Sequence, residues 1–404
     1  MKSRTIAVFT GNRAEYGLQV PVLRAISKHP NLKYQLLVSG AHLDDNFGKT
    51  LTEIVQDGFE VAEEIKIAMI PDQSTTTAKA ISSGINEICK ALERLKPDIL
   101  LVYADRFEGF AAVIAGTQMN IPTAHIEGGD ITEGGALDDS VRHAMTKLAH
   151  VHFTTNLEAS NRILAMGEES WRVHTVGFPA IDLISEGDFA NASELRESLG
   201  ISADKPLVLF TQHSVTTEYQ KSGLQVRQSL SALARLANEG VQILLTYPNN
   251  DVGGAEIIKE LERYRNHNGF VISTSLGRYK YHGILALAKT PNSRVVCAGN
   301  SSSGIKETPA FGCPTINIGS RQEGRLRGKN VIDTGYEEIE IYEAISTGLH
   351  DDEFREICRS APNPYGVGDA GVKIASVLAG VPLGEQILRK KMTNTGQYKD
   401  GWYR

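Results

Sequence analysis

The sequence predicts an α/β protein made of two doubly wound domains that face each other across a cleft. Short runs of apolar and β-branched residues alternate with longer amphipathic patterns, which is typical of parallel strands connected by helices. A polar stretch at residues 185–206 interrupts this alternation, which then starts again. The length of 404 residues suits two domains, or three. We therefore expect two similar halves, one over residues 1–182 and one over residues 183–380.

The first half opens with a strand at residues 5–10, a glycine-bounded loop and a helix at residues 18–28. Its other apolar runs are short enough to be buried strands of a parallel sheet. They lie at residues 34–38, 99–103, 122–126, 151–154 and 173–176. Helical spacing is found at residues 48–56, 76–95 and 107–119.

The second half repeats this pattern and ends in a polar tail. Its expected strands lie at residues 207–211, 243–247, 271–273, 294–297 and 315–318. Two clear helical patterns occupy residues 223–238 and 255–264. We assign residues 381–404 to a C-terminal helix followed by the tail.

Composition and charge exclude several classes of protein. With 42 Lys and Arg against 48 Asp and Glu, the net charge of −6 argues against general nucleic-acid binding. No window approaches the ~18 apolar residues of a membrane span, and the N-terminus lacks the features of a secretory signal. The four cysteines are scattered without a Cys-x-x-Cys pair, as in reduced proteins. We expect a cytoplasmic protein that contacts neither nucleic acid nor membrane.

A serine-rich turn is the strongest candidate for a phosphate site. No Gly-x-Gly-x-x-Gly follows the first strand, and no Gly-x-x-x-x-Gly-Lys-Ser/Thr motif occurs. Instead, Gly299-Asn300-Ser301-Ser302-Ser303-Gly304 follows one strand and precedes a helical pattern at residues 305–310. Backbone N–H groups at a helix start attract anions, and Ser301 and Ser302 add hydroxyl donors. A simple serine N-cap is the alternative, but it needs only one of the three serines.

Two charged residues near this turn fit the same interpretation. Arg321 follows the next strand, where a guanidinium can neutralise a diphosphate or belong to a solvated loop. Glu307 lies about one turn into the expected helix. Its carboxylate can accept both hydroxyls of a ribose, or it can simply stabilise the helix dipole.

Acidic residues follow the strands of the first half. Asp105 comes after the strand at 99–103, Glu127 ends the strand at 122–126, and Asp138 lies farther along. In open α/β sheets, ligands bind at the carboxyl ends of strands, and proton transfer uses a carboxylate as base and another as acid. The alternatives are helix capping for Asp138 and pairing of Asp105 or Glu127 with Arg106 or a backbone amide.

One histidine and one arginine occupy matching positions in the two halves. His213 ends the first strand of the second half, and Arg13 follows the first strand of the first half. His213 can act in acid/base chemistry or contact a phosphate. The His125-x-Glu127 spacing also occurs in zinc deaminases, but no Pro-Cys-x-x-Cys follows and no His-Glu-x-x-His is found. We expect no metal site.

Several longer motifs resemble those of the hydrolysing UDP-N-acetylglucosamine 2-epimerases of sialic-acid-type biosynthesis. They occur in the same order from about residue 5 to about residue 380. They are Gly11-Asn12-Arg13-Ala14-Glu15-Tyr16-Gly17, Ala104-Asp105-Arg106, His125-Ile126-Glu127-Gly128-Gly129, Asp138-Asp139-Ser140-Val141-Arg142-His143, Gly299-Asn300-Ser301-Ser302 and Asn317-Ile318-Gly319-Ser320-Arg321-Gln322.

The resemblance implies a glycosyltransferase-B-like fold of two Rossmann-like domains, with the C-terminal helices packing back toward the first. It implies elimination of the nucleotide to a 2-acetamidoglucal, followed by hydration to a free manno-configured sugar such as N-acetylmannosamine, with no cofactor. We also expect a homodimer or homotetramer. Residues 276–283 and 324–328 look like those of bacterial members, some of which act on 2,4-diacetamido-trideoxy sugars or on guanosine-linked sugars.

By motif position, the resemblance assigns acid/base roles to Asp105, Glu127 and Asp138, and contact with the departing phosphate or proton transfer to His213. The residues that it implies for substrate and nucleotide binding are Arg13, Arg106, Ser301, Ser302, Glu307 and Arg321. A non-hydrolysing epimerase, a glycosyltransferase of the same fold and a non-catalytic sugar-nucleotide sensor are the alternatives.

Overall fold

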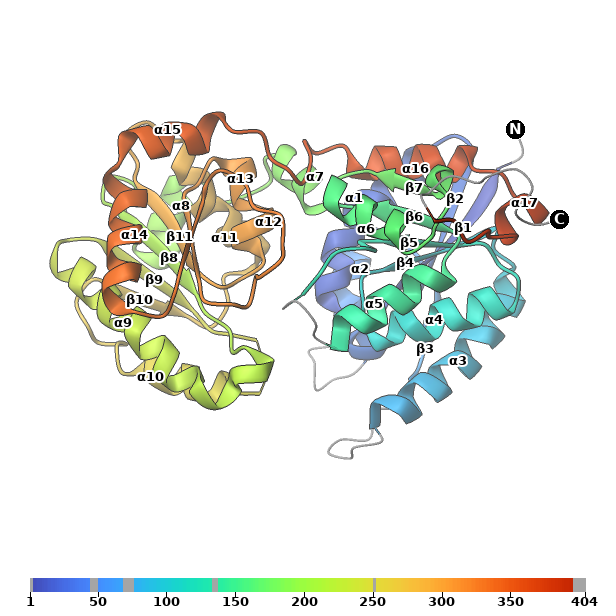
Figure 1. Cartoon of the computed structure of the whole chain (residues 1–404), viewed down its shortest axis with the longest axis horizontal. Coiled ribbons are helices and arrows are strands. Elements are labelled where there is room, and N and C mark those ends of the chain that lie inside the picture. Colours follow the sequence, from blue (N-terminus) through green and yellow to red (C-terminus); the bar gives the residue numbers. More distant parts are fainter. Residues whose placement is uncertain (1–2, 44–49, 68–75, 133–136, 250–251, 395–404) are drawn as a thin grey trace. The chain divides into compact units, whose positions relative to one another are not determined.

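The computed structural model describes residues 3–43, 50–67, 76–132, 137–249 and 252–394. The chain divides into two compact units, each built on one parallel sheet with helices packed on it (Figure 1). Unit 1 comprises Met1–Asp130, Leu137–Leu183 and Gly366–Arg404, and unit 2 comprises Ile131–Ala136 and Ile184–Tyr365. The predicted class, two doubly wound α/β domains, is confirmed. The cleft between them stays a prediction.

Unit 1 has a seven-stranded parallel sheet in the order β3-β2-β1-β4-β5-β6-β7. Its strands are β1 Arg4–Thr10, β2 Leu32–Ser39, β3 Val61–Ile65, β4 Ile99–Tyr103, β5 Thr123–Ile126, β6 Val151–Thr154 and β7 Val173–Thr175. The strand order reverses between the neighbours β1 and β4. Ligands of such sheets bind beyond the carboxyl ends of the strands at this reversal.

Alternate residues of the unit 1 strands pack into two separate hydrophobic cores, one on each face of the sheet. In β1, Ile6 and Val8 face one core and Ala7 and Phe9 face the other, as the two-residue period of a strand requires. The helices of the unit are α1 Arg13–Lys28, α2 Leu51–Gln56, α3 Thr76–Leu95, α4 Phe107–Gln118, α5 Leu137–Leu148, α6 Leu157–Ala165, α16 Ala370–Gly380 and α17 Glu385–Leu388. Helices α1 and α16 cover the first core, and α3, α4 and α5 cover the second (Figure 1).

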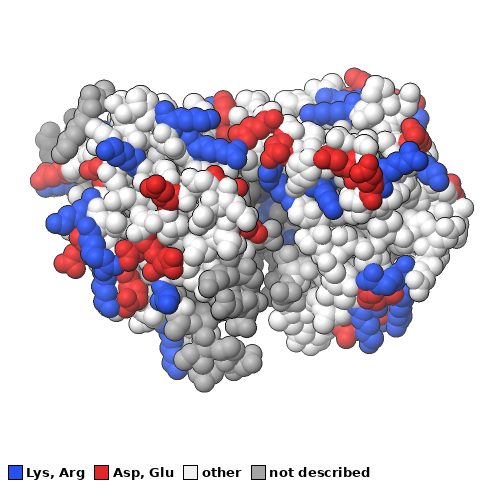
Figure 2. All heavy atoms as spheres, turned by 180° about the vertical axis from the view of Figure 1, so that it is seen from behind, with Lys and Arg blue, Asp and Glu red and all other residues white. Residues whose placement is uncertain are grey.

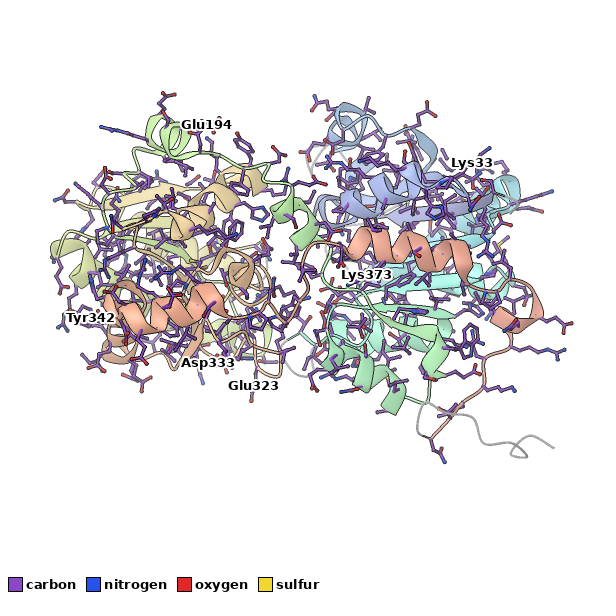
Figure 3. All side chains as sticks on the ribbon, turned by 90° about the horizontal axis from the view of Figure 1, so that it is seen from above. Lys33, Glu194, Glu323, Asp333, Tyr342 and Lys373 are labelled. Atoms are coloured by element: carbon purple, nitrogen blue, oxygen red, sulfur yellow. The ribbon has the colours of Figure 1, made fainter. Side chains whose placement is uncertain are left out.

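The chain returns from unit 2 to unit 1 at Gly366, earlier than the boundary at residue 381 that the sequence analysis expects. Helix α16, which carries Lys373 in Figure 3, packs along α1. Its first two N–H groups, those of Ala370 and Gly371, donate to the carboxylate of Asp182 at 3.0 and 2.7 Å. Residues 366–380 therefore belong to unit 1. An apolar helix face does not by itself reveal which of two similar sheets it covers.

Arg172 and Glu168 hold the segment after α16 on unit 1. The buried Arg172 guanidinium donates to the carbonyl oxygens of Gln386, Ile387 and Arg389, which caps the end of α17. Glu168 is also buried and accepts from Lys390 at 2.8 Å and from His152 Nε2 at 3.0 Å. These bonds fix the end of the described chain beside the amino ends of β6 and β7.

Unit 2 has a six-stranded parallel sheet in the order β10-β9-β8-β11-β12-β13, so its reversal lies between β8 and β11. Its strands are β8 Leu207–Thr211, β9 Gln242–Thr246, β10 Phe270–Ser273, β11 Val295–Gly299, β12 Thr315–Ile318 and β13 Val331–Thr334. Its helices are α8 Ala192–Leu199, α9 Ser222–Asn238, α10 Gly254–Glu262, α11 Gly277–Ala286, α12 Ser303–Lys306, α13 Thr308–Phe311, α14 Glu338–His350 and α15 Asp352–Ser360. Helix α7 Ala180–Ser185 carries the chain from unit 1 into unit 2.

The observed elements differ from the predicted ones at the two edge strands, at the start of α1 and in the segment 303–311. The edge strands β3 and β13 are not predicted, because most of their residues are partly buried or exposed and they lack a continuous apolar run. Helix α1 begins at Arg13 rather than Leu18, since Asn12 Oδ1 accepts from the N–H of Glu15 and caps it. The predicted helical pattern at 305–310 is two four-residue helices, α12 and α13, separated at Glu307.

The surface carries charge of both signs. On the face shown in Figure 2, Lys and Arg side chains lie among Asp and Glu side chains, without an extended area of one sign. Within the ranges that the structure covers, no helix is both long enough and apolar enough to cross a bilayer.

Buried neutral histidines should make the protein less stable in mild acid. Burial lowers the pKa of His125 and His213 to about 3 and that of His42, His150 and His152 to about 4. An unfolded chain takes up protons near pH 6.5 while these folded side chains stay neutral, so stability falls as the pH drops from about 6.5 toward 4. From pH 7 to 5.5 we expect a loss of about 1 kcal/mol per histidine.

Urea unfolding followed by circular dichroism at the two pH values measures this loss. A His152→Gln variant, which cannot take up the proton, should show a smaller difference between pH 7 and pH 5.5. Equal urea midpoints at the two pH values in the original protein would contradict the prediction.

Candidate functional site

Asp105 lies just beyond β4, at the reversal of the unit 1 sheet. The residue before it, Ala104, has a left-handed φ of 52°. The carbonyl of Ala104 accepts a hydrogen bond from His125 Nε2 at 2.6 Å, and the other ring nitrogen lies 3.2 Å from the hydroxyl of Thr146. Because burial lowers the pKa of His125 to about 3, the ring stays neutral. His125 therefore fixes the backbone that presents Asp105, and both its nitrogens are used within the protein.

Asp105 forms an ion pair with Arg142, which is on α5 and almost fully buried. The Asp105 carboxylate is 17% exposed, so solvent still reaches it. Helix α5 begins with Leu137, and the predicted site residue Asp138 lies exposed in its first turn, one helical turn before Arg142. The next residue, Asp139, is buried. The structure thus joins Asp105 to the helix that carries Asp138.

Glu127 follows β5 and is buried, with a left-handed φ of 65°. The hydroxyl of Tyr103, at the end of β4, is close to it. Burial, and after it the negative charge of Glu127, raises the pKa of Tyr103 well above its usual range, so the phenol stays protonated. Asp130 also acts on Tyr103 and is itself held by Thr155 and Asn156 at 3.0–3.1 Å. Asp105 and Glu127 therefore end neighbouring strands, as the sequence predicts.

Arg106 is half-exposed and pairs with Glu108 at 3.4 Å. The buried Glu15, whose charge acts on Arg106, accepts a hydrogen bond from the N–H of Gly11 at 3.0 Å. Burial first, and then the charge of Glu108, raises the pKa of Glu15 to about 8, so this carboxyl is protonated at neutral pH. The charge of Asp138 also acts on Arg106, which places these two predicted residues near each other. The side chain of Arg13 lies outside the described residues.

In unit 2, Asn300 locks together the loops that follow β8 and β11. Its Oδ1 accepts from the N–H of His213 at 2.6 Å, and its Nδ2 donates to the carbonyl of His213 at 2.9 Å. The neighbouring Gly299 has φ 120°, and a Cβ there would lie 1.9 Å from the carbonyl oxygen of Thr211. Only glycine lets the two strand ends approach this closely.

His213 is a buried neutral imidazole with a defined tautomer. Its Nδ1 accepts a hydrogen bond from the backbone N–H of Asn249 at 3.0 Å. Burial, and then the charge of Arg321, lowers the pKa of His213 to about 3. The ring proton is therefore on Nε2, where it is available as a hydrogen-bond donor.

Arg321 lies next to the serine turn, as the sequence predicts. Its Nη1 donates to the carbonyl of Asn300 at 3.2 Å, and Gln322 donates to the same oxygen at 2.9 Å. Ser301 and Ser302 are partly exposed beside it. Because α12 has only four residues, a long helix dipole does not contribute here, which corrects part of the sequence argument. The hydrogen-bond donors available to an anion here therefore come from the three loops that follow β8, β11 and β12.

Glu307 lies between α12 and α13 and accepts two internal hydrogen bonds. His282 Nε2 donates to Oε2 at 2.7 Å, and the Ser303 hydroxyl donates to Oε1 at 2.9 Å. Burial alone would raise the pKa of Glu307, but these bonds and the charge of Lys306 bring it below its usual value. Glu307 is thus an ionised carboxylate fixed in orientation.

Sequence reasoning missed four residues that organise the two groups: Tyr103, Arg142, Asn300 and His282. Arg142 is one turn after Asp138 on a helix, and this spacing was a usable signal. The other three act through partners distant in sequence. Asn300 lies within the serine turn and His282 within residues 276–283, but the sequence assigned neither of them an organising role. In the described part of the chain, no group of three or more His, Cys, Asp or Glu side chains has a metal-binding arrangement.

Comparison with known proteins identifies relatives of the whole chain. Two relatives are each 34% identical to the chain. One is the Campylobacter jejuni GDP/UDP-N,N'-diacetylbacillosamine 2-epimerase (hydrolyzing), aligned over 88% of this chain and 90% of the relative. The other is the Legionella pneumophila UDP-N,N'-diacetylbacillosamine 2-epimerase (hydrolyzing), aligned over 96% of this chain and 98% of the relative.

A solved structure shares the fold. The crystal structure of the Neisseria meningitidis UDP-GlcNAc 2-epimerase bound to UDP-GlcNAc superposes with a TM-score of 0.70 at 19% identity, over 94% of this chain and 99% of that one. The profile of the family described as UDP-N-acetylglucosamine 2-epimerase matches residues 24–379. The resemblance noted in the sequence is confirmed, and the chain belongs to the UDP-N-acetylglucosamine 2-epimerase family.

Proposed function

We propose that the protein is a hydrolysing 2-epimerase that converts a nucleotide-linked 2-acetamido sugar into the free manno-configured sugar and a nucleoside diphosphate. One observation carries the proposal. The strand reversal of one sheet gathers carboxylates, and the strand reversal of the other gathers neutral and cationic hydrogen-bond donors around Asn300. The first group suits proton transfer and the second suits a diphosphate.

The proposed reaction has two steps and consumes one water. A base removes the C2 proton while the bond between C1 and the diphosphate oxygen breaks, and its electrons leave with the nucleoside diphosphate. The C1=C2 double bond of the 2-acetamidoglucal forms from the C–H electron pair. Water then adds its oxygen to C1, and an acid returns a proton to the opposite face of C2.

Asp105 and Glu127 supply the carboxylates for the two transfers at C2, with Asp138 as the third acid of this group. Arg142 offsets the charge of Asp105, and the protonated Tyr103 supports Glu127. Arg106 and Arg13 attract the negatively charged substrate. The buried carboxylate of Glu108 limits the movement of the Arg106 side chain, because it pairs with the guanidinium.

His213, Ser301, Ser302 and Arg321 hold the diphosphate, and Glu307 accepts the hydroxyls of the ribose. A neutral His213 with its proton on Nε2 is a donor to the departing phosphate oxygen, which needs the stabilisation as the C1–O bond breaks. This assignment makes His213 a phosphate partner at the start of the reaction rather than a base.

The names of the relatives suggest the sugar. Both relatives at 34% identity are named for N,N'-diacetylbacillosamine linked to UDP, or to GDP or UDP. We infer that a UDP-linked 2,4-diacetamido-trideoxy sugar or UDP-N-acetylglucosamine is the substrate, in the supply of sialic- or legionaminic-type acids. Incubation with UDP- and GDP-linked forms of both sugars, read by NMR, tests this. A free sugar should appear without any acceptor.

Other products would point to the alternatives. A product that stays linked to the nucleotide would favour a non-hydrolysing epimerase, and turnover that needs an acceptor would favour a glycosyltransferase. Tight binding of a nucleotide sugar without turnover would favour a sensor. We also infer a cytoplasmic protein, from the scattered cysteines, and a homodimer or homotetramer. Light scattering would test the oligomeric state.

Ser301→Ala should mainly weaken nucleotide binding. Loss of one hydroxyl donor to a charged phosphate oxygen costs about 1.5–3 kcal/mol, so KM should rise about 10-fold or more while kcat changes little. Ser346→Ala is a matched control, because among the described residues its hydroxyl bonds only to the carbonyl of Tyr342 within α14. Unchanged KM with a collapsed kcat would contradict the phosphate role of Ser301.

A further inference from the structure

The carboxylate of Glu307 has a fixed orientation and spare acceptor capacity. An ionised carboxylate offers about four acceptor positions on its two oxygens. His282 occupies one position on Oε2, and the Ser303 hydroxyl occupies one on Oε1. One position on each oxygen remains, and the side chain is 13% exposed, so solvent or a ligand reaches it. Two vicinal hydroxyls match this remaining pair of acceptors.

His282 is built to serve Glu307. It lies on α11, and its side chain is only 4% exposed. Its ring packs against that of Phe311 of α13, with the two ring centroids 5.5 Å apart. Its Nε2 donates to Glu307, while its Nδ1 has no hydrogen-bond partner among the described residues. A buried imidazole with a single polar contact is a costly arrangement unless that contact matters. Helices α11, α12 and α13 lie together in unit 2 (Figure 1).

We propose that His282 is the positioning residue that orients the Glu307 carboxylate toward the ribose hydroxyls, and thereby makes the site select ribose over deoxyribose nucleotides. The inference rests on the proposed function, since it needs a nucleoside diphosphate in unit 2. His282 does not touch the ligand in this account. It acts by preventing rotation of the Glu307 side chain, whose misorientation would lose one of the two hydroxyl contacts.

The ratio of dissociation constants for 2'-deoxy-UDP and UDP, measured by calorimetry, tests the role directly. A merely structural histidine would change both constants together and leave their ratio intact. For the original protein we expect 2'-deoxy-UDP to bind about 10-fold or more weakly than UDP, the usual effect of losing a hydrogen bond to a charged group. His282→Leu should bring the ratio toward about 1–3-fold.

Three further variants keep the test decisive. His282→Gln, whose amide can still donate to Glu307, should keep the original ratio. Ser303→Ala removes the other donor and should also lower the ratio, which covers the case of a poorly folding His282→Leu. Ile243→Val, in the core of unit 2, should lower thermal stability slightly and leave the ratio unchanged.

The outcomes separate the inference from the proposed function. If His282→Leu and Ser303→Ala bind UDP and keep the original ratio, or if the original protein does not discriminate between the two nucleotides, the role of His282 is wrong. If the original protein binds neither UDP nor GDP at millimolar concentration, the proposed function itself fails. A ratio that falls in both variants and persists in His282→Gln supports the inference.

Discussion

Asp105→Asn is expected to lower kcat by about 10²–10⁴-fold with little change in KM. The substitution removes a carboxylate that exchanges the C2 proton, and general acid or base groups contribute rate factors of this size. The asparagine keeps nearly the same shape, and its Oδ1 can still accept from Arg142. Steady-state release of nucleoside diphosphate, measured on the substrate found in the NMR panel, gives both constants.

The control must separate catalysis from stability, because Asp105→Asn also weakens the ion pair with the buried Arg142. Glu168→Gln is matched to it, since Glu168 is a buried carboxylate paired with Lys390 in the same unit, but at the amino ends of the strands. Both variants should melt at a lower temperature, and only Asp105→Asn should lose kcat. Comparable kcat losses in both, or full kcat in Asp105→Asn, would contradict the assignment.

Gly299→Ala is expected to lower the free energy of unfolding of unit 2 by more than about 4 kcal/mol and to abolish nucleotide binding. The new methyl group would lie 1.9 Å from the carbonyl oxygen of Thr211, at a φ of 120° that alanine rarely adopts. Either the ends of β8 and β11 move apart or the loop rebuilds. Both changes break the two bonds between Asn300 and His213.

Gly240→Ala isolates the steric part of this effect. Gly240 also has a positive φ, 93°, but a Cβ there would meet no atom within 4 Å. Its replacement should cost only about 1–2 kcal/mol, the backbone penalty of a left-handed conformation. Chemical denaturation compares the two variants. Similar losses in both would mean that the close approach of the two strand ends does not matter.

The sequence was sufficient to predict the class of the fold and most of its strands. Buried parallel strands have a strong local signature, as at 99–103, 151–154, 207–211 and 315–318, where the predicted and observed bounds coincide. The edge strands β3 and β13 were not predicted because most of their residues are partly buried or exposed and form no continuous apolar run. The assignment of α16 to unit 1 was not predicted, because it depends on the contact between α16 and α1, and no local sequence pattern encodes that contact.

The same division holds for the candidate site. The ends of strands can be predicted from sequence, so Asp105, Glu127, His213 and the serine turn were placed at the carboxyl ends of strands, where the structure has them. The residues that hold these groups in position were not predicted, because each of them bonds to a partner far away in sequence. Asn300 bonds to His213 across 87 residues, and Arg142 pairs with Asp105 across 37. Long-range pairing therefore limits what one sequence predicts about how a site is organised.

The most direct test of the central claim is the reaction in heavy water, followed by NMR of the released sugar. If Asp105 and Glu127 exchange the C2 proton during hydrolysis, the free manno-configured product should carry one deuterium at C2 and be released with the nucleoside diphosphate. Release of a sugar that keeps its original hydrogen and configuration at C2 would contradict the account. It would reduce the protein to a nucleotide-sugar hydrolase without epimerase chemistry.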